Sequence, residues 1–168
     1  MSFFGSMKPL HAPRQNPRRD VVVAVPQDAL AVLDVFRECF DEPTRTDANF
    51  VRRHIAAEHV LLARHGSAVL GYAVMFEVSD YARIRSLAVR PRCRREGVGS
   101  LLVHACTLRT RLPLRVTVPE TEPVAVLNLL KKSGFVARFV RSEHPGQPHA
   151  YEFTRQPEAD ACEIGGGR

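Results

Sequence analysis

The sequence contains no run of 18 or more apolar residues, so no segment is long enough to cross a bilayer as a helix. Its longest apolar stretch, from Ala68 to Phe76, is interrupted by Gly71 and has the length of a strand. Phe3 and Phe4 stand near the beginning, but the apolar core of a secretory signal does not follow them. We therefore expect a soluble, cytoplasmic protein that has no membrane partner.

Cysteine pairs are also absent. The four cysteines are scattered along the chain and form no C-x-x-C motif, and no histidine stands at a zinc-like spacing from a cysteine pair. They are Cys39, Cys93, Cys106 and Cys162. We expect reduced thiols and no metal site. Cys93 lies between Arg92 and Arg94, where positive charge would favour the thiolate, but an ordinary loop cysteine is the preferred interpretation.

Two common phosphate-binding loops are missing. There is no G-x-x-x-x-G-K-[ST], which disfavours a nucleoside triphosphatase, and no G-x-G-x-x-G within a βαβ unit. Lysine is scarce, so the net charge of +6 comes almost entirely from arginine. Arginine suits phosphate and carboxylate recognition, which is compatible with an anionic ligand. A surplus of this size also occurs on proteins that bind nothing acidic.

The chain has 168 residues, of which 45% are hydrophobic and 25% charged, the composition and size of one globular domain. Residues 1–19 are rich in Pro, Arg, Ser and Gly without periodicity, and we predict a flexible leader. Residues 156–168 end in three consecutive glycines before Arg168 and predict a flexible tail. The domain itself is expected over residues 20–155.

Hydrophobic periodicity within residues 20–155 predicts an α+β fold. β-branched or extended apolar runs predict strands over 21–25, 60–63, 69–78, 82–89, 114–118, 135–140 and 149–153. Apolar residues at helical spacing predict helices over 30–40, 47–57, 97–108 and 126–130. The resulting order, β-α-α-β-β-β-α-β-α-β-β, is typical of a mixed sheet with about four helices on its faces.

One junction carries chemical information. The strand that includes Ile84 leads through an arginine-rich loop into Gly97 and Gly99, at the first turn of the third predicted helix. Free backbone N–H groups and the helix dipole make such a start an anion-binding site. Glycine has no side chain, so a diphosphate can approach the main chain closely.

At this junction the sequence resembles the GCN5-related N-acetyltransferase (GNAT) superfamily, whose pyrophosphate signature is Q/R-x-x-G-x-G/A. Residues 94–99, Arg-Arg-Glu-Gly-Val-Gly, match every specified position, and residues 86–91, Ser-Leu-Ala-Val-Arg-Pro, resemble the family's fourth strand. Residues 128–135, ending in Gly134-Phe135, resemble its second cofactor motif. The resemblance spans about residues 20–155 and implies a mostly antiparallel sheet of six to seven strands.

The resemblance implies acetyl-coenzyme A as cosubstrate. Backbone amides of the loop would hold its pyrophosphate: Arg94, Arg95, Glu96, Gly97, Val98, Gly99 and Ser100. The strand segment Leu87, Ala88 and Val89 would pair with the pantetheine arm, and an N–H of Leu87 or Val89 would polarise the thioester carbonyl.

The catalytic acid and base do not follow from the family pattern. Leu130 stands where many members have a tyrosine acid, Pro123 where they have an asparagine, and Thr117 or Val118 where some have a glutamate base. Glu120 and Tyr151 are therefore the predicted catalytic residues, with Glu77 and Glu122 as further acidic candidates; for each of these, an ordinary surface or packing role is the competing interpretation.

The sequence predicts an enzyme that transfers acetyl from acetyl-coenzyme A to a primary amine, either a small molecule or a peptide or protein N-terminus, by direct attack. The alternative is a non-catalytic acyl-coenzyme A sensor or interaction module, favoured by Leu130 and Pro123. A nucleic-acid partner is disfavoured, because the arginines of residues 83–95 have no interleaved aromatic residues. The sequence does not settle the oligomeric state and leaves a homodimer open.

Overall fold

The computed structural model describes residues 19–40, 48–121, 123–140 and 149–157. Nearly all of the predicted leader and tail, together with Glu122 and Cys162, lies outside these residues. Among the described residues no helix is long and apolar enough to span a membrane.

Seven strands form one sheet in the order β1-β2-β3-β4-β5-β7-β6. They are β1 (Arg19–Val23), β2 (Val60–His65), β3 (Ala68–Val78), β4 (Tyr81–Val89), β5 (Leu114–Pro119), β6 (Val136–Val140) and β7 (Ala150–Arg155). Every neighbouring pair is antiparallel except β4 and β5, which run parallel. The predicted mostly antiparallel sheet and its element order are confirmed.

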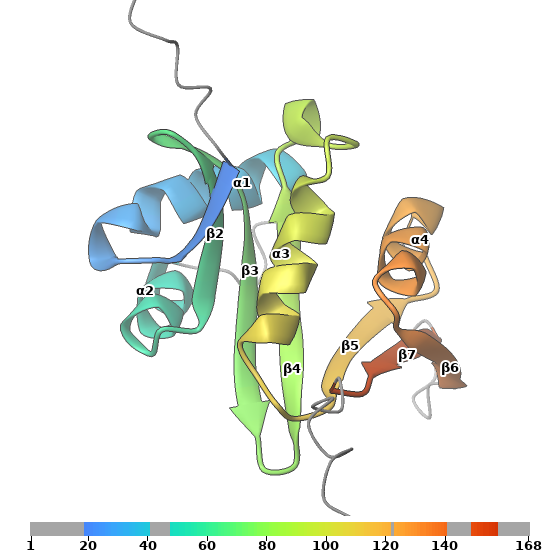
Figure 1. Cartoon of the computed structure of the whole chain (residues 1–168). Coiled ribbons are helices and arrows are strands. Elements are labelled where there is room, and N and C mark those ends of the chain that lie inside the picture. Colours follow the sequence, from blue (N-terminus) through green and yellow to red (C-terminus); the bar gives the residue numbers. More distant parts are fainter. Residues whose placement is uncertain (1–18, 41–47, 122, 141–148, 158–168) are drawn as a thin grey trace, which may run out of the picture.

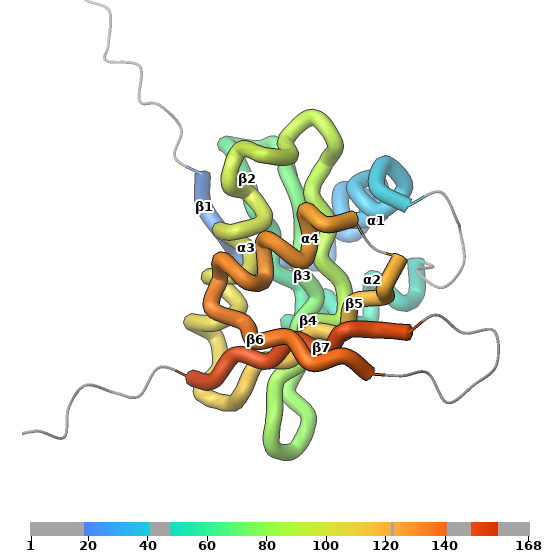
Figure 2. Tube along the Cα trace, turned by 90° about the vertical axis from the view of Figure 1, so that its right-hand side faces the viewer, coloured from blue at the N-terminus to red at the C-terminus, as the bar shows by residue number. Residues whose placement is uncertain are grey.

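Four α-helices cover the two faces of this sheet: α1 (Ala29–Cys39), α2 (Ala48–Ala56), α3 (Val98–Leu108) and α4 (Val124–Lys132). Figures 1 and 2 show α1 and α2 on one face and α3 on the other. Two short 3-10 helices, η1 (Pro26–Asp28) and η2 (Pro91–Cys93), precede α1 and α3. The helices begin and end within two residues of the positions that the apolar spacing predicts.

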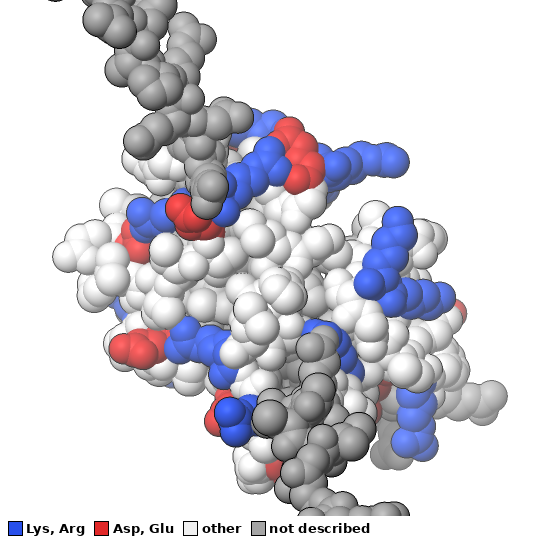
Figure 3. All heavy atoms as spheres, viewed as in Figure 1, with Lys and Arg blue, Asp and Glu red and all other residues white. Residues whose placement is uncertain are grey.

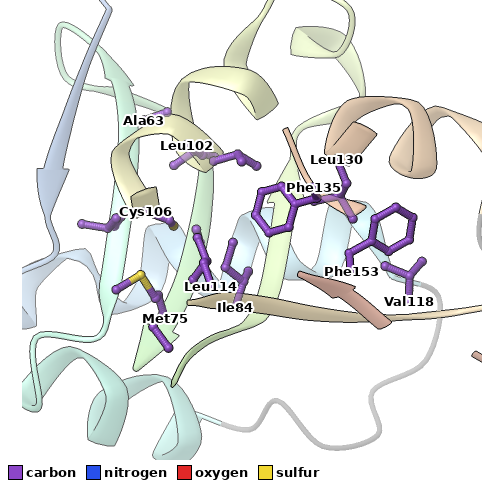
Figure 4. Packing of buried hydrophobic residues seen from close by; sticks show 14 of the residues in the cluster. Ala63, Met75, Ile84, Leu102, Cys106, Leu114, Val118, Leu130, Phe135 and Phe153 are labelled. Carbon is purple, nitrogen blue, oxygen red and sulfur yellow. The ribbon is translucent and has the colours of Figure 1, made fainter. Parts of the chain in front are cut away.

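The two faces of the sheet have separate hydrophobic cores. One core joins the sheet to α3 and α4, and Figure 4 shows Leu130, Phe135 and Phe153 of this core side by side with Val118. The other core joins α1 and α2 to β2 and β3, and Tyr72 is its largest fully buried residue. Since side chains of a strand alternate between faces, each central strand supplies residues to both cores.

The sheet opens between β4 and β5. Only three residue pairs join these strands, of which the last is Ile84 with Val116, and the strands diverge beyond it (Figure 1). At the same level β4 contains a β-bulge, because Ile84 faces Met75 whereas Ser86 faces Val74, which leaves Arg85 as an extra residue. The second half of β4 therefore has β3 on one side and no strand on the other.

Candidate active site

The start of α3 has backbone donors that make no bond within the helix. The first main-chain bond of the helix runs from Leu101 N to Gly97 O (3.0 Å). The amides of residues 98–100 therefore have no carbonyl acceptor within the helix. Gly97 has φ +83°, a left-handed conformation that favours glycine, and a Cβ there would meet no atom within 4 Å. The junction thus combines amides that have no acceptor in the helix with open space beside Gly97.

Arginine side chains surround this junction. Arg94 and Arg95 are exposed, and the one acidic residue of the loop, Glu96, is paired with Arg19 of β1 through both its carboxylate and its carbonyl. That ion pair offsets the negative charge that would otherwise repel an anion. Figure 3 shows basic side chains on this face in separate groups rather than as one continuous patch.

Main-chain groups on β4 face the opening. Arg90 N donates to Leu70 O of β3 (2.9 Å), and bonding alternates along an antiparallel strand, so Ala88 also turns its main chain toward β3. The main chains of Leu87 and Val89 therefore face away from β3. The carbonyl of Val89 accepts bonds from Arg94 Nε (3.2 Å) and Cys39 Sγ (3.3 Å), which leaves its N–H toward the opening.

Cys39 at the end of α1 is a contact that the sequence analysis missed. Partial burial raises the pKa of its thiol above the ordinary value, although Arg94 opposes this effect. The thiol therefore stays protonated near neutral pH and can act as the donor to Val89. Cys93, the cysteine singled out in the sequence, is half-buried and packs against the core beside α3.

A cavity of about 330 Å³ occupies the opening and reaches both faces of the sheet. Its apolar lining comes from α1, α2, β4, β5 and α4, and its polar side chains are Arg85, Ser86 and Thr117. The apolar lining residues are Phe36, Phe40, Phe50, Ile84, Leu87, Val116, Val118, Pro119, Val126 and Leu130. No carboxylate, histidine or tyrosine of the described residues lines the cavity.

Ser86 is held by a buried tyrosine on the neighbouring strand. Its hydroxyl lies 3.2 Å from the phenol oxygen of Tyr72, whose side chain is fully buried in the core beneath α1. Burial raises the pKa of Tyr72 to about 12, although the bond to Ser86 acts in the opposite direction. The phenol is consequently neutral throughout the physiological range and fixes the position of the Ser86 hydroxyl.

This pKa predicts a loss of stability at high pH. The folded-state pKa of Tyr72 lies above the unfolded value of 10.0, so the folded protein binds more protons between pH 10 and 12 and its stability falls as pH rises. Relative to Tyr72→Phe, the wild type should lose about 1 kcal/mol of unfolding free energy by pH 11. Urea unfolding of both proteins at pH 8 and pH 11 measures the difference; equal losses would contradict it.

The predicted catalytic residues Glu120 and Tyr151 are not among the residues that line the cavity. Glu120 is exposed just beyond β5, where its N–H donates to His149 O (2.8 Å). Tyr151 on β7 packs edge-on against Phe139, with ring centroids 5.4 Å apart, and contacts the core beneath α4. Their catalytic roles stay predictions.

The other predicted positions divide between core and surface. Leu130, at the place of the family's tyrosine, is fully buried and lines the cavity. Glu77 accepts a bond from Thr110 Oγ1 (2.7 Å). Of the arginines at residues 83–95, Arg90 is paired with Glu38 of α1, whereas Arg85 lines the cavity.

Glu152 on β7 is a carboxylate that the sequence analysis did not single out. It stands opposite Thr117 in the β5–β7 ladder, while its neighbour Phe153 is buried in the core beneath α4. Because side chains alternate along a strand, Glu152 and Thr117 point to the face that carries α1 and α2. Only the strand order, with β7 between β5 and β6, brings these two residues together.

The described residues contain no group of three or more histidine, cysteine or acidic side chains that could hold a metal ion. The positions that face the opening supply backbone amides, arginines and apolar side chains instead. This set fits a ligand with an anionic end and an extended arm.

The comparisons with known proteins agree with this geometry. Residues 29–135, more than half of the chain, match the model of the acetyltransferase (GNAT) family, and the chain belongs to that family. No curated protein matches the sequence. Acetyl-coenzyme A as cosubstrate fits the family.

Solved structures share the fold at low sequence identity. Ard1 from Thermoplasma volcanium has a TM-score of 0.69 and 23% identity over 82% of this chain and 96% of that one. The ribosomal-protein-S18-alanine N-acetyltransferase from Escherichia coli has a TM-score of 0.67 and 17% identity over 89% and 100%. YncA from Salmonella typhimurium, solved with acetyl-CoA, has a TM-score of 0.67 and 15% identity over 89% and 99%.

Proposed function

We propose that this protein is an N-acetyltransferase that moves the acetyl group of acetyl-coenzyme A to a primary amine. The observation that carries the proposal is the opening between β4 and β5, which lies beside the free amides at the start of α3. An acyl thioester on a long arm with a diphosphate needs both features. The family match supports acyl transfer, whereas the amine as acceptor is our own inference.

The cofactor loop would bind the diphosphate. The amides from Arg95 to Ser100 would donate to its oxygens, helped by the side chains of Arg94 and Arg95. The predicted amide of Arg94 is not available, because it donates to Pro91 O (3.3 Å) at the end of η2. The space in front of Gly97 supports this placement, because a Cβ would project into it. The ion pair of Glu96 with Arg19 keeps the loop positively charged overall.

The edge of β4 would bind the pantetheine arm as an added strand. Leu87 offers an N–H and a carbonyl, and Val89 offers its N–H, since its carbonyl already has two donors. An amide N–H of β4 would hold the thioester oxygen as negative charge develops on it. Ala88 would contribute by its bond to β3, which keeps this edge straight.

The acceptor would enter from the face that carries α1 and α2. The diphosphate site belongs to α3, which covers the opposite face, so the two substrates would meet within the opening (Figure 2). Phe36, Phe40 and Phe50 form the wall on the acceptor side. Holding both reactants there lowers the barrier, since a bimolecular reaction becomes effectively intramolecular.

The amine would have to lose its proton to water, because the described lining has no basic group that could accept it. An α-amine has a pKa near 7.7–8.0 and a lysine side chain one near 10.4, so at pH 7 the neutral fraction of an α-amine is a few hundredfold larger. This favours a peptide or protein N-terminus or a small α-amine. The name of the Escherichia coli relative, an alanine N-acetyltransferase, supports the same acceptor type.

Two measurements test the proposal. Acetyl-coenzyme A at 100 times its dissociation constant should stabilise the protein by about 2.7 kcal/mol, which appears as a rise of several degrees in Tm. Release of coenzyme A thiol should then require an added amine and be faster with an α-amine than with an Nε-amine at pH 7. Unchanged Tm at saturating cofactor would contradict cofactor binding itself.

The alternative function is an acyl-coenzyme A sensor. The buried Leu130, at the place of the family's phenol, favours it, because no described tyrosine lines the cavity. A sensor predicts the same rise in Tm but no thiol release with any amine. The two functions therefore differ only in turnover.

A further inference from the structure

The acceptor side of the cavity combines an aromatic wall with a single cation. Phe36 and Phe40 of α1 lie with their ring centroids 4.9 Å apart, and Phe50 of α2 completes the wall. Arg85 is the only charged residue of the described chain that lines the cavity. A ligand that satisfies both parts needs an apolar group and a negative charge.

The β-bulge explains why Arg85 reaches this cavity. Residues of a regular strand alternate between faces, but a bulge directs two successive side chains toward the same side. Arg85 and Ser86 both line the cavity on the side of α1 and α2, because Ser86 bonds to Tyr72 of the core there and Arg85 lies near His54 of α2. Arg85 is exposed and lies near enough to His54 of α2 to influence the pKa of that imidazole.

The charge of Arg85 is not neutralised by the described protein. No carboxylate among the described residues lies within 4.0 Å of its guanidinium, whereas Arg64 and Arg90 are both in ion pairs. Its neighbour His54 adds no second positive charge at neutral pH, because partial burial lowers the pKa of His54, and His59, Arg53 and Arg85 lower it further. Glu152 on the same face is separated from β4 by β5.

We propose that Arg85 binds a carboxylate of the acceptor, so that the substrate is a primary amine that carries a carboxylate beside an apolar group. This inference rests on the proposed N-acetyltransferase function. A guanidinium binds a carboxylate through two parallel N–H donors, and the rings of the wall cover the apolar group. A polyamine is disfavoured, because its second cation would approach Arg85 without a described carboxylate to hold it.

The experiment compares acceptors that differ only in the anion. Phenylalanine and phenylalaninamide form one pair, and the peptides Glu-Ala-Ala-amide and Gln-Ala-Ala-amide form the second, which distinguishes a free amino acid from a peptide with an acidic side chain. Arg85→Gln should lower kcat/KM about 10- to 100-fold for a carboxylate acceptor, mainly through KM, and less than threefold for its amide partner. Within each pair, the change in kcat/KM for the acid is divided by the change for the amide. This ratio removes the effect of the different amine pKa values.

Arg52→Gln is the matched control. Arg52 is an exposed arginine of α2 outside the cavity lining, so its loss removes the same charge without touching the acceptor. It should change both acceptors of a pair by less than twofold. The rise in Tm with acetyl-coenzyme A should be the same in wild type, Arg85→Gln and Arg52→Gln, which excludes misfolding as the cause.

Charge reversal gives an independent result. Arg85→Glu should abolish the preference for carboxylate acceptors and increase kcat/KM for spermidine above the wild-type value. Equal losses for acid and amide, or a wild type that prefers spermidine, would overturn the role of Arg85 while leaving the acetyltransferase function in place. Absence of transfer to every amine, with cofactor binding intact, would instead overturn the proposed function.

Discussion

Replacing Gly97 with valine should abolish the stabilisation of the protein by acetyl-coenzyme A. The new side chain would project into the open space where no protein atom lies within 4 Å, which is the space we assign to the diphosphate. A β-branched residue is also disfavoured at φ +83°, so the chain would leave the conformation that presents the amides. Binding should weaken at least 100-fold, and thermal unfolding with and without the cofactor measures it.

Gly66 provides a control for the conformational part of this effect. It lies in the β2–β3 turn at φ +61°, and a Cβ there would also meet nothing within 4 Å. Gly66→Val and Gly97→Val should therefore each lower the unfolding free energy by about 1–2 kcal/mol. Its rise in Tm with acetyl-coenzyme A should nevertheless equal that of the wild type. A cofactor response that survives in Gly97→Val would refute the placement of the diphosphate.

Gly71→Ala should destabilise the protein, although it adds only one methyl group. A Cβ on Gly71 of β3 would lie 2.5 Å from the carbonyl oxygen of Ala88, which is backbone and cannot rotate away. Separating β3 from β4 should cost about 1–3 kcal/mol of unfolding free energy. Because Ala88 lies between Leu87 and Val89, the same shift should also weaken acetyl-coenzyme A binding.

Gly99→Ala is the comparison for this prediction. A Cβ there would lie 3.1 Å from Leu129 Cδ2, the end of a side chain that can move, and alanine is the better residue within a helix. We expect a change in unfolding free energy smaller than 1 kcal/mol. Urea unfolding of the two variants at pH 7 compares them. Similar costs for Gly71→Ala and Gly99→Ala would show that the backbone contact of Gly71 is unimportant.

The proposed cofactor half of the site follows from local sequence, because its proposed ligand groups are main-chain atoms of consecutive residues. The segment that contains Gly97 and Gly99 determines its own conformation: a strand, a turn and a helix start. The amides that result do not depend on distant residues. Residues 94–100 could therefore be singled out without knowledge of the sheet order.

The proposed acceptor half could not be predicted in this way, because the lining of the cavity comes from five separate elements. Arg85 looks like one of several arginines in the sequence, and only the β-bulge and the ion pairs of its neighbours distinguish it. Tyr72 and Ser86 are 14 residues apart and meet through the register of β3 with β4. The sequence analysis likewise offered Glu120 and Tyr151, which the structure places outside the cavity lining.

The sequence by itself determined the elements, their order and the glycine-containing start of α3 that we propose as the anion site, since each depends on periodicity or on a few adjacent residues. The tertiary structure alone decided where β4 and β5 separate, which side chains line the space between them and which arginine there lacks an ion pair. The physical reason is that strand order and register are set by long-range packing of the two cores. No local pattern in the chain encodes which distant strand will become a neighbour.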